Sequence, residues 1–182
     1  MSLKLLSNGV YLASGLLTGN INIYSIATGN LIANLLGHTG AVYDLSLITS
    51  NLLASSGVDK TVRIWDSTTY APIFTLNGHN GTIFGLKVIS SEILASASLD
   101  NTVKLWDISS GTLIRTLANH SDRLYYSVDL YIQPNILITV SCDHTIKLWD
   151  IDTGQVLRTI NDNNTLWMRS VTVFDLIPTT SE

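Results

Sequence analysis

Serine, histidine and aspartate recur together along this chain, and hydrolases combine these residue types in a nucleophilic triad. Three histidines are spaced by 41 and 41 residues, and each is followed by a hydroxyl residue and, four positions further on, an aspartate: His38, Ser55 and Asp59; His79, Ser96 and Asp100; His120, Thr139 and Asp143. A catalytic triad occurs once per site, whereas this set occurs three times. The chain also lacks the Gly-x-Ser-x-Gly motif of a nucleophile elbow. We therefore interpret the sets as structural.

A tryptophan accompanies each set, six residues after its aspartate. Trp65, Trp106 and Trp149 are spaced by 41 and 43 residues, and each precedes an aspartate. An indole has one N–H donor and a large apolar body, so it can be buried where an acceptor reaches it. The recurrence of four residue types at one period indicates an internal repeat of 41–43 residues.

Each repeat reads as short strands separated by turns. In the best-defined copy the expected strands are residues 83–88, 94–98, 103–106 and 113–117. Alternation places Val103 and Leu105 on one face of a strand, and Lys104 and Trp106 on the other. No segment has the periodicity of a helix. The unit is therefore a four-stranded antiparallel meander. A degenerate copy precedes the three clear ones, with Tyr24 in place of the tryptophan.

Composition excludes several classes of protein. The 182 residues include 10 Lys and Arg against 14 Asp and Glu, a net charge of −4, so no basic stripe for nucleic acid is expected. Hydrophobic residues make up 46%, which excludes a disordered chain. The single cysteine, Cys142, permits no internal disulfide framework. No signal peptide or membrane span is predicted, and no metal or cofactor site. We expect a cytoplasmic protein, or a nuclear one.

These motifs resemble the WD-repeat β-propeller family, through Gly37-His38, Gly78-His79, three Trp-Asp pairs and the period. The resemblance implies an all-β fold, a propeller of four-stranded antiparallel blades, here an incomplete or open sector of a larger propeller. The blades are expected at about 3–36, 37–77, 78–118 and 119–161, with the start of a fifth at 162–177. It further implies that each histidine, hydroxyl, aspartate and tryptophan form a buried hydrogen-bonded tetrad.

The resemblance also implies a partner-binding surface, on the top face near the central channel. An aromatic residue stands five positions after each histidine: Tyr43, Phe84 and Tyr125. The other family contact positions carry Arg123, with Ala41 and Thr82 as its counterparts, and Val58, Leu99 and Cys142, with Leu17 as theirs. Exposed aromatic and apolar residues are common at interaction sites. The alternative is that these side chains pack between neighbouring blades.

The expected function is a non-catalytic scaffold that binds a protein or peptide partner, with self-association or further blades of a longer chain completing the ring. The alternative is an accessory or sensor segment of a larger multidomain enzyme or signalling protein, including a ubiquitin-ligase substrate receptor. No Trp-Asp pair has an arginine two places after its aspartate, which in the family marks docking to a cullin-ligase adaptor; Thr68, Ser109 and Asp152 stand there. A propeller hydrolase ranks last, because the three sets are alike.

Overall fold

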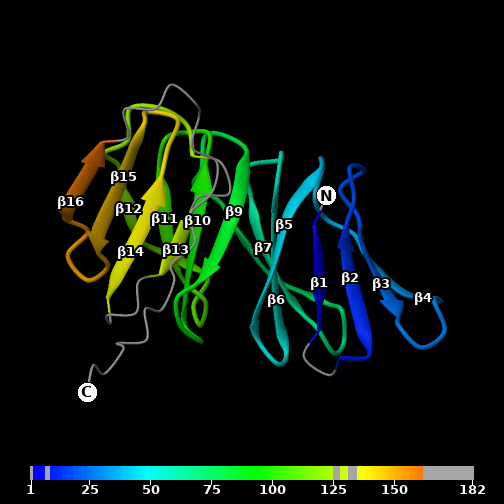
Figure 1. Ribbon diagram of the computed structural model, residues 1–182. Coiled ribbons are helices and arrows are strands. Elements are labelled where there is room, and N and C mark those ends of the chain that lie inside the picture. The colour runs from blue at the N-terminus through cyan, green and yellow to red at the C-terminus, as the bar shows by residue number, and fades with distance from the viewer. Residues whose placement is uncertain (1, 7–8, 125–127, 131–134, 162–182) are drawn as a thin grey trace, which may run out of the picture.

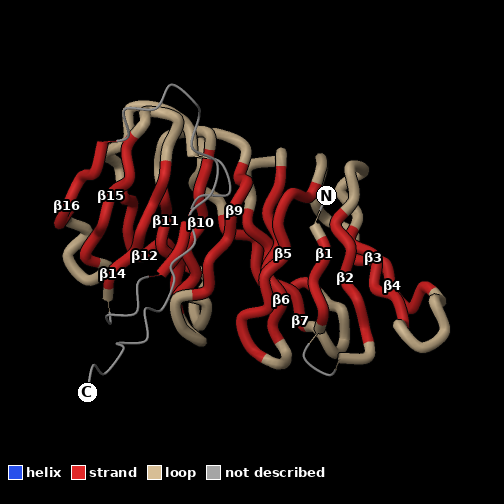
Figure 2. Tube along the Cα trace, in the orientation of Figure 1, coloured by secondary structure: helices blue, strands red, loops and turns tan. Residues whose placement is uncertain are grey.

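A computed structural model describes residues 2–6, 9–124, 128–130 and 135–161 of the chain. Every regular element in these ranges is a β-strand (Figure 2). In the described part of the chain, no helix has the length and hydrophobicity needed to cross a membrane. The all-β fold expected from the short alternating segments is confirmed.

The strands form four antiparallel sheets of four consecutive strands each, which we call blades 1 to 4. Blade 1 contains β1 (Leu3–Leu5), β2 (Tyr11–Gly15), β3 (Ile21–Ser25) and β4 (Leu31–Leu35). Blade 2 contains β5 (Val42–Thr49), β6 (Leu52–Gly57), β7 (Val62–Asp66) and β8 (Pro72–Leu76). Blade 3 contains β9 (Ile83–Val88), β10 (Ile93–Ser98), β11 (Val103–Asp107) and β12 (Thr112–Leu117). Blade 4 contains β13 (Val128–Leu130), β14 (Ile136–Val140), β15 (Thr145–Asp150) and β16 (Val156–Asn161).

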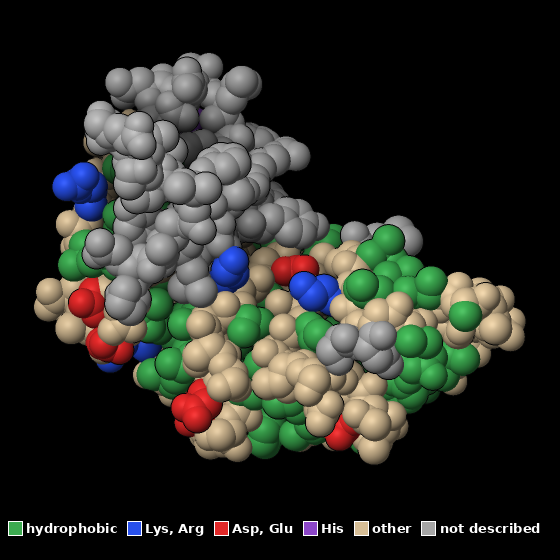
Figure 3. Space-filling view, turned by 60° about the horizontal axis from the view of Figure 1, so that its bottom comes forward, with side chains coloured by type: hydrophobic (Ala, Val, Ile, Leu, Met, Phe, Trp, Pro, Cys, Tyr) green, Lys and Arg blue, Asp and Glu red, His purple; other side chains and the backbone are tan. Residues whose placement is uncertain are grey.

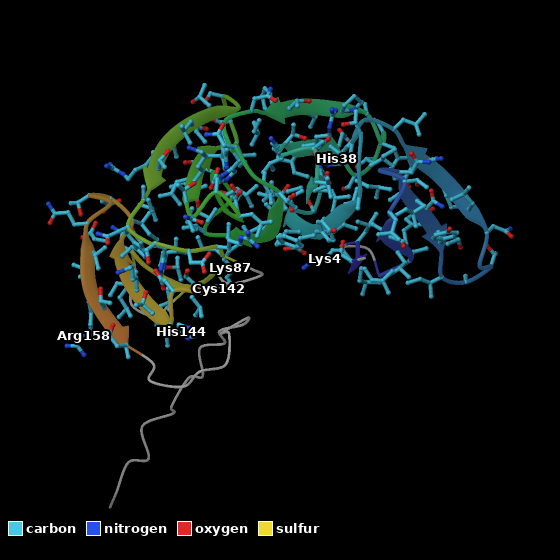
Figure 4. The ribbon with its side chains drawn as sticks, turned by 90° about the horizontal axis from the view of Figure 1, so that it is seen from above. Lys4, His38, Lys87, Cys142, His144 and Arg158 are labelled. Atoms are coloured by element: carbon cyan, nitrogen blue, oxygen red, sulfur yellow. The ribbon has the colours of Figure 1, made fainter. Side chains whose placement is uncertain are left out.

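The four blades follow one another along an open arc (Figure 1). Each blade is a simple meander whose first strand lies nearest its neighbours: β1 contacts β5, β5 contacts β9, and β9 contacts β13. Seen from above, blade 1 and blade 4 stand at the two ends of the arc and do not meet (Figure 4). This arrangement confirms the expected propeller sector of four-stranded blades that does not close.

Three apolar clusters hold the arc together, one at each junction between successive blades. The tryptophan of each blade is almost fully buried and packs towards the preceding blade: Trp65 joins Ile21 and Ile23, Trp106 joins Val62 and Ile64, and Trp149 joins Val103 and Leu105. The expected alternation is therefore present in β11, where Val103 and Leu105 face blade 4 and Trp106 faces blade 2. Burial of one large indole per junction supplies much of the hydrophobic stabilisation.

The outer hairpin of each blade, between its third and fourth strands, has a β-bulge beside the tryptophan position, followed by a turn residue in the left-handed conformation. Glycine supplies that residue at Gly29, Gly111 and Gly154. In blade 2 the same place is taken by Tyr70, with φ 64°. A bulky side chain rarely adopts a positive φ, so Tyr70 is a backbone outlier.

Side chains of the preceding blade explain why a tyrosine fits at this turn. A Cβ at Gly111 would lie 2.6 Å from the ring of Phe74, so blade 3 requires glycine for space as well as for φ. In blade 1 the position that corresponds to Phe74 is occupied by Ala33, since Ala33 pairs with β3 as Phe74 pairs with β7. The alanine side chain is much smaller than the phenylalanine ring. Both Ala33 and Tyr70 pack against the cluster between blades 1 and 2. A large side chain on one blade is thus matched by a small one on the other.

Blade 1 presents an apolar face at the beginning of the arc. Leu3 is 67% exposed and Leu5 is 52% exposed. Leu45 in blade 2 and Leu86 in blade 3 occupy the position that corresponds to Leu3, because each pairs with the hydroxyl residue of the second strand (Ser55 and Ser96), as Leu3 pairs with Ser14. Leu45 is only 3% exposed and Leu86 only 9%. Positions that blades 2 and 3 bury against a preceding blade are therefore open to solvent in blade 1.

Candidate functional site

In blades 2, 3 and 4 the histidine, the hydroxyl residue, the aspartate and the tryptophan form a continuous hydrogen-bonded chain. The distances from histidine Nδ1 to the aspartate are 2.9, 2.7 and 2.8 Å. Those from histidine Nε2 to the hydroxyl are 2.7, 2.8 and 2.7 Å. The indole Nε1 donates to the same hydroxyl at 2.8, 2.8 and 2.7 Å. The structure thus brings together all twelve residues of the three sets.

Each aspartate also fixes two segments of backbone. Asp100 accepts from the N–H of Asn80, next to the histidine, at 2.8 Å and from the hydroxyl of Thr102 at 2.7 Å. Asp59 and Asp143 make the same contacts with the residues at the corresponding positions. The tetrad therefore ties the loop that enters a blade to the turn between its second and third strands.

The threonine two places after each aspartate, absent from the sequence interpretation, is the further member of this network. Thr61, Thr102 and Thr145 recur with spacings of 41 and 43 residues, the same as the tryptophans. That spacing is the signal by which they could have been found. Threonine is common in turns of any kind, so its presence alone did not distinguish them.

The electrostatics of the tetrads favour ionised aspartates. Burial would raise the pKa of Asp59, but hydrogen bonds from His38, Thr61 and the Thr39 N–H together bring this pKa down to about 2. The balance is the same at Asp143, whose pKa is also about 2, and at Asp100, whose pKa lies well below its usual range. Burial lowers the pKa of His120, although the bond to Asp143 opposes that change.

The tetrad has the hydrogen-bond connectivity of a hydrolase triad, but its hydroxyl group is fully buried. Ser55, Ser96 and Thr139 are 0% exposed. Each hydroxyl oxygen already accepts the indole proton, and its own hydrogen is available to the histidine. A catalytic nucleophile must be accessible to a substrate carbonyl, and these buried oxygens are not accessible in this conformation. The arrangement serves to satisfy buried polar groups.

The residues expected to contact a partner lie at the same end of the blades as the tetrad turns. A backbone bond joins two of these positions in each blade: Val58 N–H to Ala41, Leu99 N–H to Thr82, and Cys142 N–H to Arg123, all at 2.9 Å. Val58 is 40% exposed, Leu17 is 66% exposed and Arg123 is exposed, while Leu99 is half-buried. Cys142, only 7% exposed, offers little surface to a partner, unlike Val58 at the corresponding position.

Two of the three expected aromatic residues stack on each other across the junction of blades 2 and 3. The rings of half-buried Tyr43, on β5, and Phe84, on β9, have centroids 4.4 Å apart and planes inclined by 33°. Tyr125 lies outside the described residues. The pair therefore combines both interpretations offered by the sequence, since each ring packs against the next blade and leaves part of its surface exposed.

A half-buried carboxylate on the inner strand of blade 2, that of Asp44, is a further polar group that the sequence interpretation missed. Asp44 Oδ2 accepts the N–H of Leu86 on blade 3 at 2.8 Å, and Oδ1 accepts the N–H of Leu45 at 2.8 Å. Burial raises the pKa of Asp44 to about 6, although these two bonds and the charge of Lys4 lower it. Lys4 and Lys87 lie on the concave side of the arc (Figure 4). Asp44 thus links two inner strands directly.

No cluster of three or more candidate metal ligands occurs among the residues that the structure describes. The described site therefore consists of three structural tetrads and a partly exposed aromatic and apolar surface beside them.

Comparison with known proteins agrees with this geometry. The family model of the WD domain, G-beta repeat, matches residues 29–66, 70–107 and 111–150. WD repeat and SOCS box-containing protein 1 of Homo sapiens is 46% identical over 57 residues, covering 30% of this chain and 14% of that protein. Periodic tryptophan protein 2 homolog of Schizosaccharomyces pombe is 53% identical over 47 residues, covering 25% and 6%. The chain thus spans only a small part of these relatives.

A solved structure of the WD40 beta propeller domain of Doa1 superimposes with a TM-score of 0.73 at 24% sequence identity. The match covers 89% of this chain and 53% of that one, so the described arc corresponds to about half of that propeller chain. The repeat model matches more than half of the 182 residues, with each match ending at a Trp-Asp pair. The chain belongs to the WD-repeat family.

Proposed function

We propose that this chain is a non-catalytic scaffold that binds a peptide or protein partner through the face carrying the tetrad turns. WD40 domains generally bind proteins, which supports the general role. The observation that supports this particular surface is the Tyr43–Phe84 stack, in which two half-buried aromatic rings lie at the same end of the blades as the exposed Val58. Rigid aromatic residues of this kind are frequent hot spots in protein interfaces.

The experiment first selects peptides that bind the wild-type chain from a displayed random library, and then measures their Kd by calorimetry. Tyr43→Ala and Phe84→Ala should each weaken binding by at least about 30-fold, the usual effect of losing a hot-spot side chain. Phe74→Ala is the matched control, because Phe74 is a half-buried aromatic on the outer strand β8. It should leave the Kd unchanged.

Melting temperatures separate a binding role from a packing role. Trp106→Ala removes a side chain that is 1% exposed, so its melting temperature should fall far more than those of Tyr43→Ala and Phe84→Ala. If the two aromatic variants melt as low as Trp106→Ala, these rings are core residues, and the proposal fails.

An alternative is that the chain is the accessory segment of a larger multidomain protein, including a ubiquitin-ligase substrate receptor. The observation that favours it is the similarity to proteins named for WD repeats together with a SOCS box, of which the matched part is only 14%. Affinity purification of the full-length gene product, followed by mass spectrometry, tests this alternative. Recovery of cullin-ligase subunits would support it, and their absence would favour the simple scaffold.

A further inference from the structure

The junction between blades 1 and 2 differs from the other two at one backbone position. The residue after each Trp-Asp pair donates its N–H to the loop between the first and second strands: Ser67 to Asn51 at 2.9 Å, Ile108 to Glu92 at 2.8 Å, and Ile151 to Asn135 at 2.9 Å. Ile108 and Ile151 are buried in the apolar clusters of their junctions, with exposures of 3% and 5%. Ser67 is smaller and polar, so it cannot fill the same space.

A pocket of about 350 Å³ lies at this position. Leu6 and Tyr11 of blade 1 line one side, and the residues of blade 2 that line the other are Ser50, Asn51, Ser67, Thr68 and Tyr70. Because β7 runs from the tetrad turn to this hairpin, the pocket opens on the opposite end of the blades, which we call the bottom face. Figure 3 shows the molecule with this face turned forward, and on the part of it that is not grey, hydrophobic side chains are widespread whereas Lys, Arg, Asp and Glu side chains are few and scattered.

The chemistry of the lining selects an uncharged ligand. Among the described residues it consists of one leucine, two phenols, one amide and three hydroxyls, and none of these residues carries a carboxylate, ammonium, guanidinium or imidazole group. A charged group entering such a site would lose hydration without gaining an ionic partner. The hydroxyl of Ser67 donates to the carbonyl of Ser50 at 3.1 Å, so its oxygen can still accept a hydrogen bond.

The wall formed by Tyr70 is held in an unfavourable backbone conformation. Its φ of 64° is unfavourable for a residue with a Cβ, and the other three blades avoid this strain with glycine. Tyr70 and Tyr11 both pack against the cluster between blades 1 and 2, which fixes their rings beside the pocket. The structure gives neither phenol hydroxyl a hydrogen bond within the described ranges. Strain of this kind is often retained where a site needs a particular side chain.

We infer that this pocket is a second binding site, on the bottom face, for an uncharged aromatic or large aliphatic side chain of a partner peptide. The incoming side chain takes the place that Ile108 and Ile151 fill in the other junctions and packs between the two tyrosine rings. The amide of Asn51 and the hydroxyl of Thr68, both on exposed residues at the mouth, bond the peptide groups beside it. The site is separate from the Tyr43–Phe84 surface, so one chain can hold two peptide segments.

The test uses blocked amino acids as probes, with ¹⁵N-labelled protein observed by NMR. N-acetyl-phenylalaninamide and N-acetyl-leucinamide should shift the backbone amides of Asn51, Ser67 and Thr68 in a saturable way. N-acetyl-lysinamide and methyl β-glucoside should not. Ser67→Ile should weaken the response at least tenfold, since it supplies the side chain that fills the other junctions. Ser109→Ile, at an exposed turn of blade 3, is the matched control and should respond as the wild type does.

A second variant covers the possibility that Ser67→Ile perturbs folding. Asn51→Lys places a charge at the exposed mouth, where the fold tolerates it, and should abolish the response to the uncharged probes. Tyr43→Ala should leave the response unchanged, so loss of the top-face site and loss of this one are distinguishable. The inference is wrong if the uncharged blocked amino acids cause no saturable shift, if lysinamide or glucoside acts as well as they do, or if Ser67→Ile responds fully.

Discussion

Replacing Asp44 with asparagine removes a carboxylate that the fold holds in an unfavourable environment. Its side chain lies between blades 2 and 3, where it accepts the N–H of Leu86 and the N–H of Leu45. An asparagine carbonyl can keep one of these bonds but not both, since its NH₂ group cannot accept. The absolute stability of Asp44→Asn therefore reflects two opposing changes, whereas its pH dependence isolates the charge.

The size of the pH effect follows from the pKa of Asp44, which is about 6 in the folded chain against 3.8 for an ordinary aspartate. The folded state binds the proton more tightly, so stability rises as the pH falls through 6 and stops rising below 3.8. The full difference corresponds to roughly 3 kcal/mol, at about 1.4 kcal/mol per pKa unit. Between pH 7 and pH 4 it amounts to about 2 kcal/mol.

Urea denaturation at pH 7, 6, 5 and 4 measures this quantity. On moving from pH 7 to pH 4, the free energy of unfolding of the wild type should rise by about 2 kcal/mol more than that of Asp44→Asn. Glu92→Gln, which neutralises an exposed carboxylate, should follow the wild-type profile. Parallel profiles for the wild type and Asp44→Asn would refute the reasoning, because they would mean that Asp44 titrates alike in both states.

Ser96→Ala should lower the free energy of unfolding by about 1–3 kcal/mol, because the buried Trp106 and His79 both lose their partner; exposed Ser109→Ala should change it little in the same denaturation experiment. Between pH 4 and pH 2 the wild type should lose stability, since the lowered pKa of Asp143 means its ionised form stabilises the fold until it is protonated near pH 2; acid titrations should show a shallower loss for Asp143→Asn. A fluorophosphonate probe should leave Ser55 and Ser96 unlabelled, and an adduct on either in a peptide mass map would contradict a structural role. Light scattering on a size-exclusion column should show self-association of the isolated chain, driven by exposed residues such as Leu3; a sharp monomer peak would count against it.

The fold and the tetrads could be predicted from sequence because the same residue types recur at the same positions in three copies of the repeat. His79, Ser96 and Trp106 are unremarkable singly, and their recurrence gave them a meaning. The same logic fails where one copy departs from the rest. Cys142 shares its position with exposed Val58 and yet is buried. Ser67 shares its position with two buried isoleucines, and only three-dimensional packing shows the hollow that it leaves.

The matching of large and small side chains across the outer hairpins has a consequence for recombination. A blade with Phe74 must be followed by one with glycine at the turn, as at Gly111, while a blade with Ala33 can be followed by Tyr70. The turn residue of each blade must thus fit the side chain of the blade before it. The blades are therefore not interchangeable, although they share one architecture. Exchanging blade 1 for a duplicate of blade 2 would set Phe74 against Tyr70. Gene duplication or design of longer arrays must therefore place each blade after one whose side chain leaves room for its turn residue.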